Sequence, residues 1–99
     1  MNENIGKITI FPEVIEEIIA YNVNKKKEIE LFSKRPIRYE IKKNKIIINI
    51  MVRVEFGVRI PDLTWEIQKT IKEDMERLTH FNIKEINIHI QEFKFPENA

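Results

Sequence analysis

The stretch from residue 46 to residue 93 constrains the fold of this 99-residue chain more than any other. Its pattern predicts a long strand that ends at Gly57, a helix that opens at Pro61, and a second strand. Two strands joined by a crossover helix lie parallel in one sheet. The stretch therefore indicates a domain that contains both helix and sheet.

Apolar residues alternate along these strands and recur every three or four residues along this helix. In the strand 45–56, one face is formed by Ile46, Ile48, Ile50, Val52, Val54 and Phe56. The helix carries an apolar stripe made of Leu63, Ile67, Ile71, Met75 and Leu78. The last strand, 83–93, directs inward Ile86, Ile88 and Ile90. Such periodicities predict one buried face for each element.

The first half of the chain follows the same rules. Gly6–Phe11 alternates isoleucine with polar residues and predicts a strand. Pro12 opens a helix that we expect to end at residues 22–24, because asparagine tolerates the left-handed conformation that closes helices. Residues 28–32 and 37–42 predict two further strands, the second of which enters a tight turn with Asn44 at positive φ.

The predicted order is β-α-β-β-β-α-β. Since each strand has one apolar and one polar face, both helices should cover the same face of a mixed sheet, giving a two-layer α+β sandwich. Residues 1–99 form a single domain in this prediction, and 94–99 form a frayed tail. The bare sheet face has no aromatic residue predicted at its centre, which argues against base stacking.

Composition excludes several function classes. The net charge is +1, so the chain as a whole has no strong attraction to nucleic acid, and without cysteine there is no disulfide or thiolate chemistry. No apolar run approaches the ~20 residues that span a bilayer, so we expect a soluble cytoplasmic protein without direct membrane insertion. His80 and His89 lack metal-ligand spacing. No catalytic or cofactor motif occurs, and we expect neither an enzyme nor a cofactor.

Lysine and arginine are concentrated in the middle of the chain. Ten basic residues stand there against three glutamates: Lys25, Lys26, Lys27, Lys34, Arg35, Arg38, Lys42, Lys43, Lys45 and Arg53. Such a segment can meet nucleic-acid phosphates or anionic lipid headgroups. A solvated fringe that protects strand edges is the alternative. Lysine is abundant throughout the chain, so we favour the fringe and regard nucleic acid as the lesser hypothesis.

Trp65 lies on the second predicted helix, roughly opposite the apolar stripe at about 100° per residue. Tryptophan is enriched at interaction hot spots. The candidate protein interface therefore consists of Trp65, Lys69, Lys72 and Glu76. The alternative is that the indole folds back over the start of the helix near Pro61.

Four motifs cover nearly the whole chain. They comprise Gly6, Ile8, Ile10, Glu13, Val14 and Ile15; Phe56 and Gly57; Ile60, Pro61, Asp62, Leu63, Ile67 and Gln68; and Leu78, Thr79, Phe81, Ile83, Glu85, Ile86, Asn87, Ile88 and Ile90. In this order they resemble the alkaline shock protein family, the Asp/Gls envelope-stress group of Gram-positive bacteria. Residues 25–28 and 43–45 depart from its glycine-containing turns, and His80 replaces a glycine. The chain thus resembles a short, divergent member.

The resemblance implies a non-enzymatic protein that associates with copies of itself as a homo-oligomer. It also implies a cytoplasmic protein that a separate, membrane-anchored partner holds at the membrane periphery in some species. Its role would concern the cell envelope under stress. The family offers no catalytic residues to transfer to this sequence.

Overall fold

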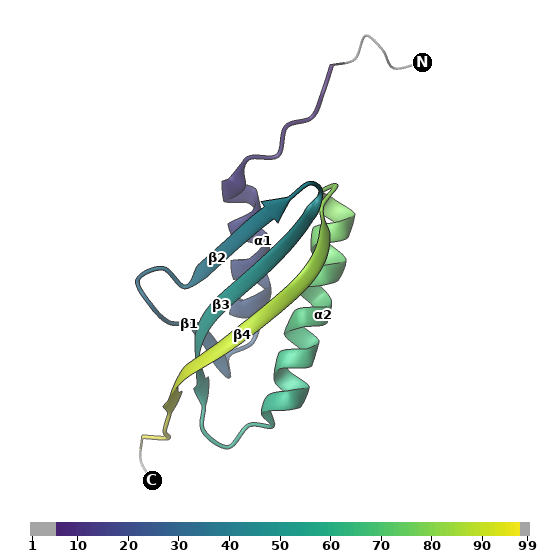
Figure 1. The fold of residues 1–99 in the computed structure, drawn as a ribbon. Coiled ribbons are helices and arrows are strands. Elements are labelled where there is room, and N and C mark those ends of the chain that lie inside the picture. The colour runs from purple at the N-terminus through teal and green to yellow at the C-terminus, as the bar shows by residue number, and fades with distance from the viewer. Residues whose placement is uncertain (1–5, 98–99) are drawn as a thin grey trace.

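The structure, a computed structural model that describes residues 6–97, is arranged around strand β3 (Lys45–Glu55) (Figure 1). Strands β1 (Ile29–Leu31) and β2 (Ile37–Lys42) pair with one edge of β3, both antiparallel. Strand β4 (Asn82–Lys94) pairs with the other edge and runs parallel to β3. Helix α2 (Ile60–Leu78) joins β3 to β4, which confirms the predicted crossover unit and the mixed sheet.

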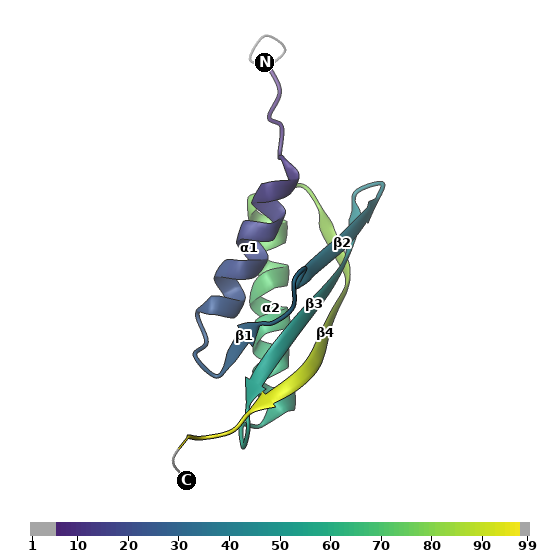
Figure 2. The same cartoon turned by 90° about the vertical axis from the view of Figure 1, so that its left-hand side faces the viewer.

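Helix α1 (Pro12–Asn24) and α2 lie side by side on the same face of the sheet (Figure 2). The predicted two-layer α+β sandwich is therefore confirmed. Each helix has a proline in its first turn, where the missing backbone N–H would have had no helical partner. The alternation of β3 is complete, with every second side chain buried beneath the helices.

The core contains the predicted apolar residues except at the ends of their elements. Fully buried side chains include Ile46, Ile48, Ile50, Val52, Val54, Ile15, Ile19, Ile67, Ile71 and Met75. Phe56 and Leu78, predicted inside, are 55% and 50% exposed. Phe56 follows the last residue of β3 and Leu78 is the last residue of α2, so the opposing layer no longer covers them.

Two local predictions about asparagine are wrong. Lys43, and not Asn44, takes the positive φ of the hairpin, at 60°. Helix α1 ends at Asn24, within the expected range, but Lys25 follows it in a right-handed conformation, so neither Asn22 nor Asn24 closes it in the left-handed one. Thr79 closes α2, since its hydroxyl donates to the Met75 carbonyl at 2.6 Å.

The predicted first strand is absent. Residues 6–11 precede α1 and extend away from the sheet, without a neighbouring strand (Figures 1 and 2). Ile8 is 89% exposed and Phe11 is 62% exposed. The alternation gives this segment the pattern of a strand, but a strand also needs a partner for its backbone groups. At the other end, β4 continues through Lys94, one residue into the predicted tail, and residues 98 and 99 lie outside the described residues.

Replacing Ile48 with Ala should lower the free energy of unfolding by about 2–5 kcal/mol, because the variant loses buried methylene groups and gains a cavity in the core. Ile8→Ala makes the same chemical change at an exposed position and should cost less than about 0.5 kcal/mol. Urea denaturation of both variants measures the difference. Equal losses would contradict the assigned core.

Candidate protein interface at helix α2 and strand β4

A groove of about 330 Å³ runs between α2 and the first half of β4. It is lined by Trp65, Gln68, Lys69, Lys72, Ile83, Lys84, Glu85 and Ile86. The indole of Trp65 is 62% exposed, and the Lys69 ammonium lies 5.3 Å from its ring centre. Of the two placements that the sequence leaves open for Trp65, the structure has the exposed one.

Three of the four predicted interface residues share this groove. Lys72 also pairs with Glu76, the fourth, at 3.2 Å along the helix. Sequence reasoning missed the contribution of β4, namely Ile83 and Ile86, because only the tertiary structure brings that strand beside α2. The exposed apolar surface of this site thus comes from two elements.

The outer edge of β4 has no neighbouring strand among residues 6–97. The side-chain amide of Gln68 donates to the backbone carbonyl of Ile86 at 3.0 Å. A side chain of α2 thus provides the hydrogen bond to this carbonyl of β4. The remaining outward groups of this edge are left to solvent.

The bare face of the sheet is a network of polar contacts. Arg53 pairs with Glu30, its Nε donating at 2.7 Å, and its guanidinium lies 4.9 Å from the ring centre of Phe32. Asn49 Oδ1 accepts from Asn87 at 3.2 Å and lies 2.9 Å from His89 Nε2. These groups engage one another, which leaves them less available to a ligand.

Seven of the ten predicted basic residues lie near the two ends of β3, and Lys34, Arg35 and Arg38 lie between these ends. Residues 25–27 precede β1, and residues 42–45 form the turn between β2 and β3 at the opposite end. Lys26 pairs with Glu66 at 2.6 Å. Arg53 pairs with Glu30. The loop between β1 and β2 holds Lys34 and Arg35, and Arg38 lies on β2. The structure therefore does not gather the ten residues into one patch.

Lys84 of β4 joins the lysines of the β2–β3 turn. Together with Glu40 and Ile47, four lysines line a hollow of about 190 Å³: Lys42, Lys43, Lys45 and Lys84. Sequence reasoning missed Lys84 because its proximity depends on the parallel pairing of β4 with β3.

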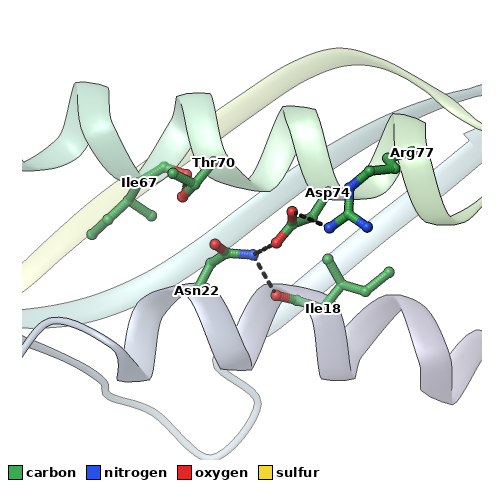
Figure 3. A network of polar contacts seen from close by, with 6 residues as sticks. All are labelled: Ile18, Asn22, Ile67, Thr70, Asp74 and Arg77. Atoms are coloured by element: carbon green, nitrogen blue, oxygen red, sulfur yellow. Dashed lines mark hydrogen bonds and ion pairs between the residues drawn. The ribbon is translucent and has the colours of Figure 1, made fainter.

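A buried polar contact joins the two helices (Figure 3). Asn22 is 1% exposed, and its amide donates to the Ile18 carbonyl at 2.9 Å and to Asp74 Oδ2 at 3.1 Å. Arg77 donates to the other oxygen of Asp74 at 3.0 Å. The Asn22 hydrogen bond first, and Arg77 second, lower the pKa of Asp74 against the opposing effect of burial. The sequence carries one signal of this contact: Asn22 lies four residues after Ile18, and so falls within the apolar stripe of α1.

The other perturbed groups also have structural causes. Burial, and then the nearby Glu16 and Glu13, raise the pKa of Tyr39. The hydrogen bond from Lys26 lowers the pKa of Glu66. Over the described part of the chain, no three histidine, cysteine or acidic side chains gather in a way that could hold a metal ion.

Comparison with known proteins identifies the family. The sequence model of the alkaline shock protein family matches residues 22–95, and this family is described as having a cell envelope-related function. The chain belongs to the alkaline shock protein family. This confirms the resemblance seen in the sequence motifs, and the family carries a cell envelope-related function.

Two relatives of this alkaline shock family chain align over more of its length than the family model does. It is 31% identical to the uncharacterized protein YqhY of Bacillus subtilis, over 97% of this chain and 83% of that protein. It is 26% identical to the uncharacterized protein Spy1535 of Streptococcus pyogenes, over 90% of this chain and 80% of that protein. No solved structure matches the chain. Within residues 6–97, neither helix has both the length and the apolar composition that crossing a membrane requires.

Replacing Asp74 with Asn should lower the free energy of unfolding by about 1 kcal/mol at pH 7, the usual net value of a hydrogen bond. The folded-state pKa of Asp74 lies below its unfolded value. Its stabilisation is therefore complete above the unfolded pKa and is lost as the pH falls through the folded pKa. The difference between wild type and Asp74→Asn should shrink as the pH falls below about 4, measured by urea denaturation.

Asp62→Asn is the matched control, because Asp62 lies on the same helix, is mostly exposed, and pairs with Arg59 at 3.1 Å. Its effect should stay below about 0.5 kcal/mol. An Asp74→Asn effect that stays constant down to about pH 2 would contradict the role given to this carboxylate.

Proposed function

We propose that this chain is a non-enzymatic scaffold domain of the envelope stress response that associates with copies of itself. The interaction surface is the groove between α2 and β4 together with Trp65. A membrane-anchored partner protein holds this cytoplasmic domain at the membrane periphery. The observation that carries the proposal is the 62% exposure of the lone tryptophan at the edge of an apolar groove.

The exposed position of the Trp65 indole supports this assignment, because association would bury it. A large aromatic side chain that is exposed beside Ile83 and Ile86 loses its contact with water when a partner covers the groove. Such side chains supply much of the binding energy at protein interfaces. The cell envelope-related function of the alkaline shock protein family supports the biological setting.

The non-enzymatic assignment rests on the ionisable groups. Asp74 and Glu66 have lowered pKa values because they accept hydrogen bonds from Asn22 and Lys26, as structural carboxylates do. Asp74 shares its hollow with Glu17, but both of its oxygens already accept hydrogen bonds, from Asn22 and from Arg77. The nucleic-acid alternative requires one continuous basic surface, and the separation of most of the lysines between the two ends of β3 does not favour it.

Replacing Trp65 with Ala should raise the dissociation constant of the self-associated form by at least about tenfold, because a hot-spot side chain contributes about 2 kcal/mol or more. Sedimentation of the purified protein over a range of concentrations measures this constant. Tyr21→Ala is the matched control, because Tyr21 is also 62% exposed and has Lys25 at 5.0 Å from its ring centre.

Tyr21→Ala should leave the dissociation constant unchanged. In wild type, the fluorescence of Trp65 should shift to shorter wavelength as the concentration rises and the indole leaves water. A protein that stays monomeric at every concentration, with constant emission, would refute the proposed self-association.

A further inference from the structure

We propose that residues 6–11 of one copy add as a strand to the outer edge of β4 in a second copy. Ile8 and Ile10 would then cover the groove beside Trp65. This inference rests on the proposed self-association and specifies its geometry. It joins three features of the described residues: a segment without a neighbouring strand, an outer strand edge and an exposed indole.

The donor is a strand-like segment without a sheet. Gly6–Phe11 alternates apolar and polar side chains, yet it lies away from the body of the domain (Figure 2). Ile8 is the most exposed large apolar side chain among the described residues, at 89%. Pairing with a sheet edge would satisfy the backbone groups of the segment and remove this side chain from water.

The acceptor is the longest strand of the structure. Strand β4 has 13 residues and, within residues 6–97, pairs with β3 alone. A long edge with unpaired backbone groups is a template for strand addition from another chain. The amide of Gln68 already occupies the Ile86 carbonyl, so the added strand would pair with other backbone groups of this edge.

Because side chains alternate along a strand, the added segment would present its isoleucines to one face of the sheet and its polar residues to the other. If Ile8 and Ile10 face the helices, they lie over the groove that contains Trp65, Ile83 and Ile86. Lys7 and Thr9 then lie on the bare face. That face of β4 carries Glu85, which by register is opposite Ile47 of β3. Lys7 would then lie on the same face of the sheet as this carboxylate, which also accepts from the Asn87 amide.

The outer edge of β2 is a poorer acceptor. It offers six residues, fewer than half the length of β4. Its bare-face positions are Arg38, Glu40 and Lys42, so Lys7 would meet two positive charges there against one negative charge. The hollow beside β2 is lined mainly by polar and charged side chains, including Glu16, Arg35 and Arg38. A segment that presents two isoleucines fits the apolar groove at β4 better.

The strand must come from a second copy because of its reach. The segment joins the folded domain beside β2, where the Tyr39 hydroxyl lies 3.5 Å from the Pro12 carbonyl. A position beyond β4 is three strand spacings away, or roughly 14 Å. At about 3.3 Å per residue, that crossing consumes more than about four of the segment's residues. Ile8 and Ile10 lie only four and two residues before Pro12, so they would not reach the groove at β4 in the same molecule.

The first experiment compares neighbouring positions on opposite faces of the segment. Ile8→Asn should raise the dissociation constant of the self-associated form at least about tenfold, and Thr9→Asn should change it less than about threefold. Both residues are exposed in the structure, so both variants should fold as wild type does. Sedimentation of the full chain gives the constants, and urea denaturation confirms the fold.

The second experiment uses the absence of natural cysteine. Copies with Thr9→Cys are mixed with copies that carry either Glu85→Cys on β4 or Glu40→Cys on β2, and a short thiol-reactive cross-linker is added. Products that join two different copies should form with Glu85→Cys, and Ile8→Asn in the Thr9→Cys copy should abolish them. A chain with both Thr9→Cys and Glu85→Cys reports cross-linking within one molecule.

The outcomes separate this inference from the proposed function. Preferential cross-linking to Glu40→Cys, or cross-linking only within one copy, would overturn strand addition at β4. Self-association that Ile8→Asn leaves intact while Trp65→Ala weakens it would also overturn the inference, but would retain the proposed function. A wild-type chain that is monomeric at all concentrations would overturn both.

Discussion

The burial of alternate side chains of β3 beneath two helices is the interaction on which the rest of the structure depends. Ile46, Ile48, Ile50, Val52 and Val54 have no exposed surface. Since side chains alternate along a strand, burying this series fixes which face of the sheet receives the helices. It also constrains the register of the three neighbouring strands, because β1 and β2 pair with one edge of β3 and β4 with the other.

A sheet built around one central strand has two outer edges. Strand β4 leaves the longer one unpaired within the described chain, and α2 lies beside it with Trp65 directed to solvent. The interaction surface is therefore a consequence of the crossover connection, which brings a helix flank and a strand edge together. The polar contact from Asn22 to Asp74 holds α1 against α2 and so supports the position of this helix.

Much of the fold could be predicted because the apolar periodicity was strong in the middle of each element. Predictions failed where the periodicity alone could not report the surroundings. Gly6–Phe11 alternates as well as β2 does, yet only β2 has β3 beside it. Asn22 looked like a helix end, whereas the position of Asp74 across the interface made it a buried donor. Trp65 could be placed on the correct helix flank but not beside β4.

The sequence by itself determined the two-layer α+β architecture, the crossover unit and the motifs of the alkaline shock protein family, because these depend on patterns within single elements. The tertiary structure decided which edges stay unpaired, that Ile83 and Ile86 join Trp65, and that most of the basic residues are divided between the two ends of β3. The physical reason is that these features depend on contacts between segments far apart in the chain. Local periodicity records which face of an element is buried, but not which other element covers it.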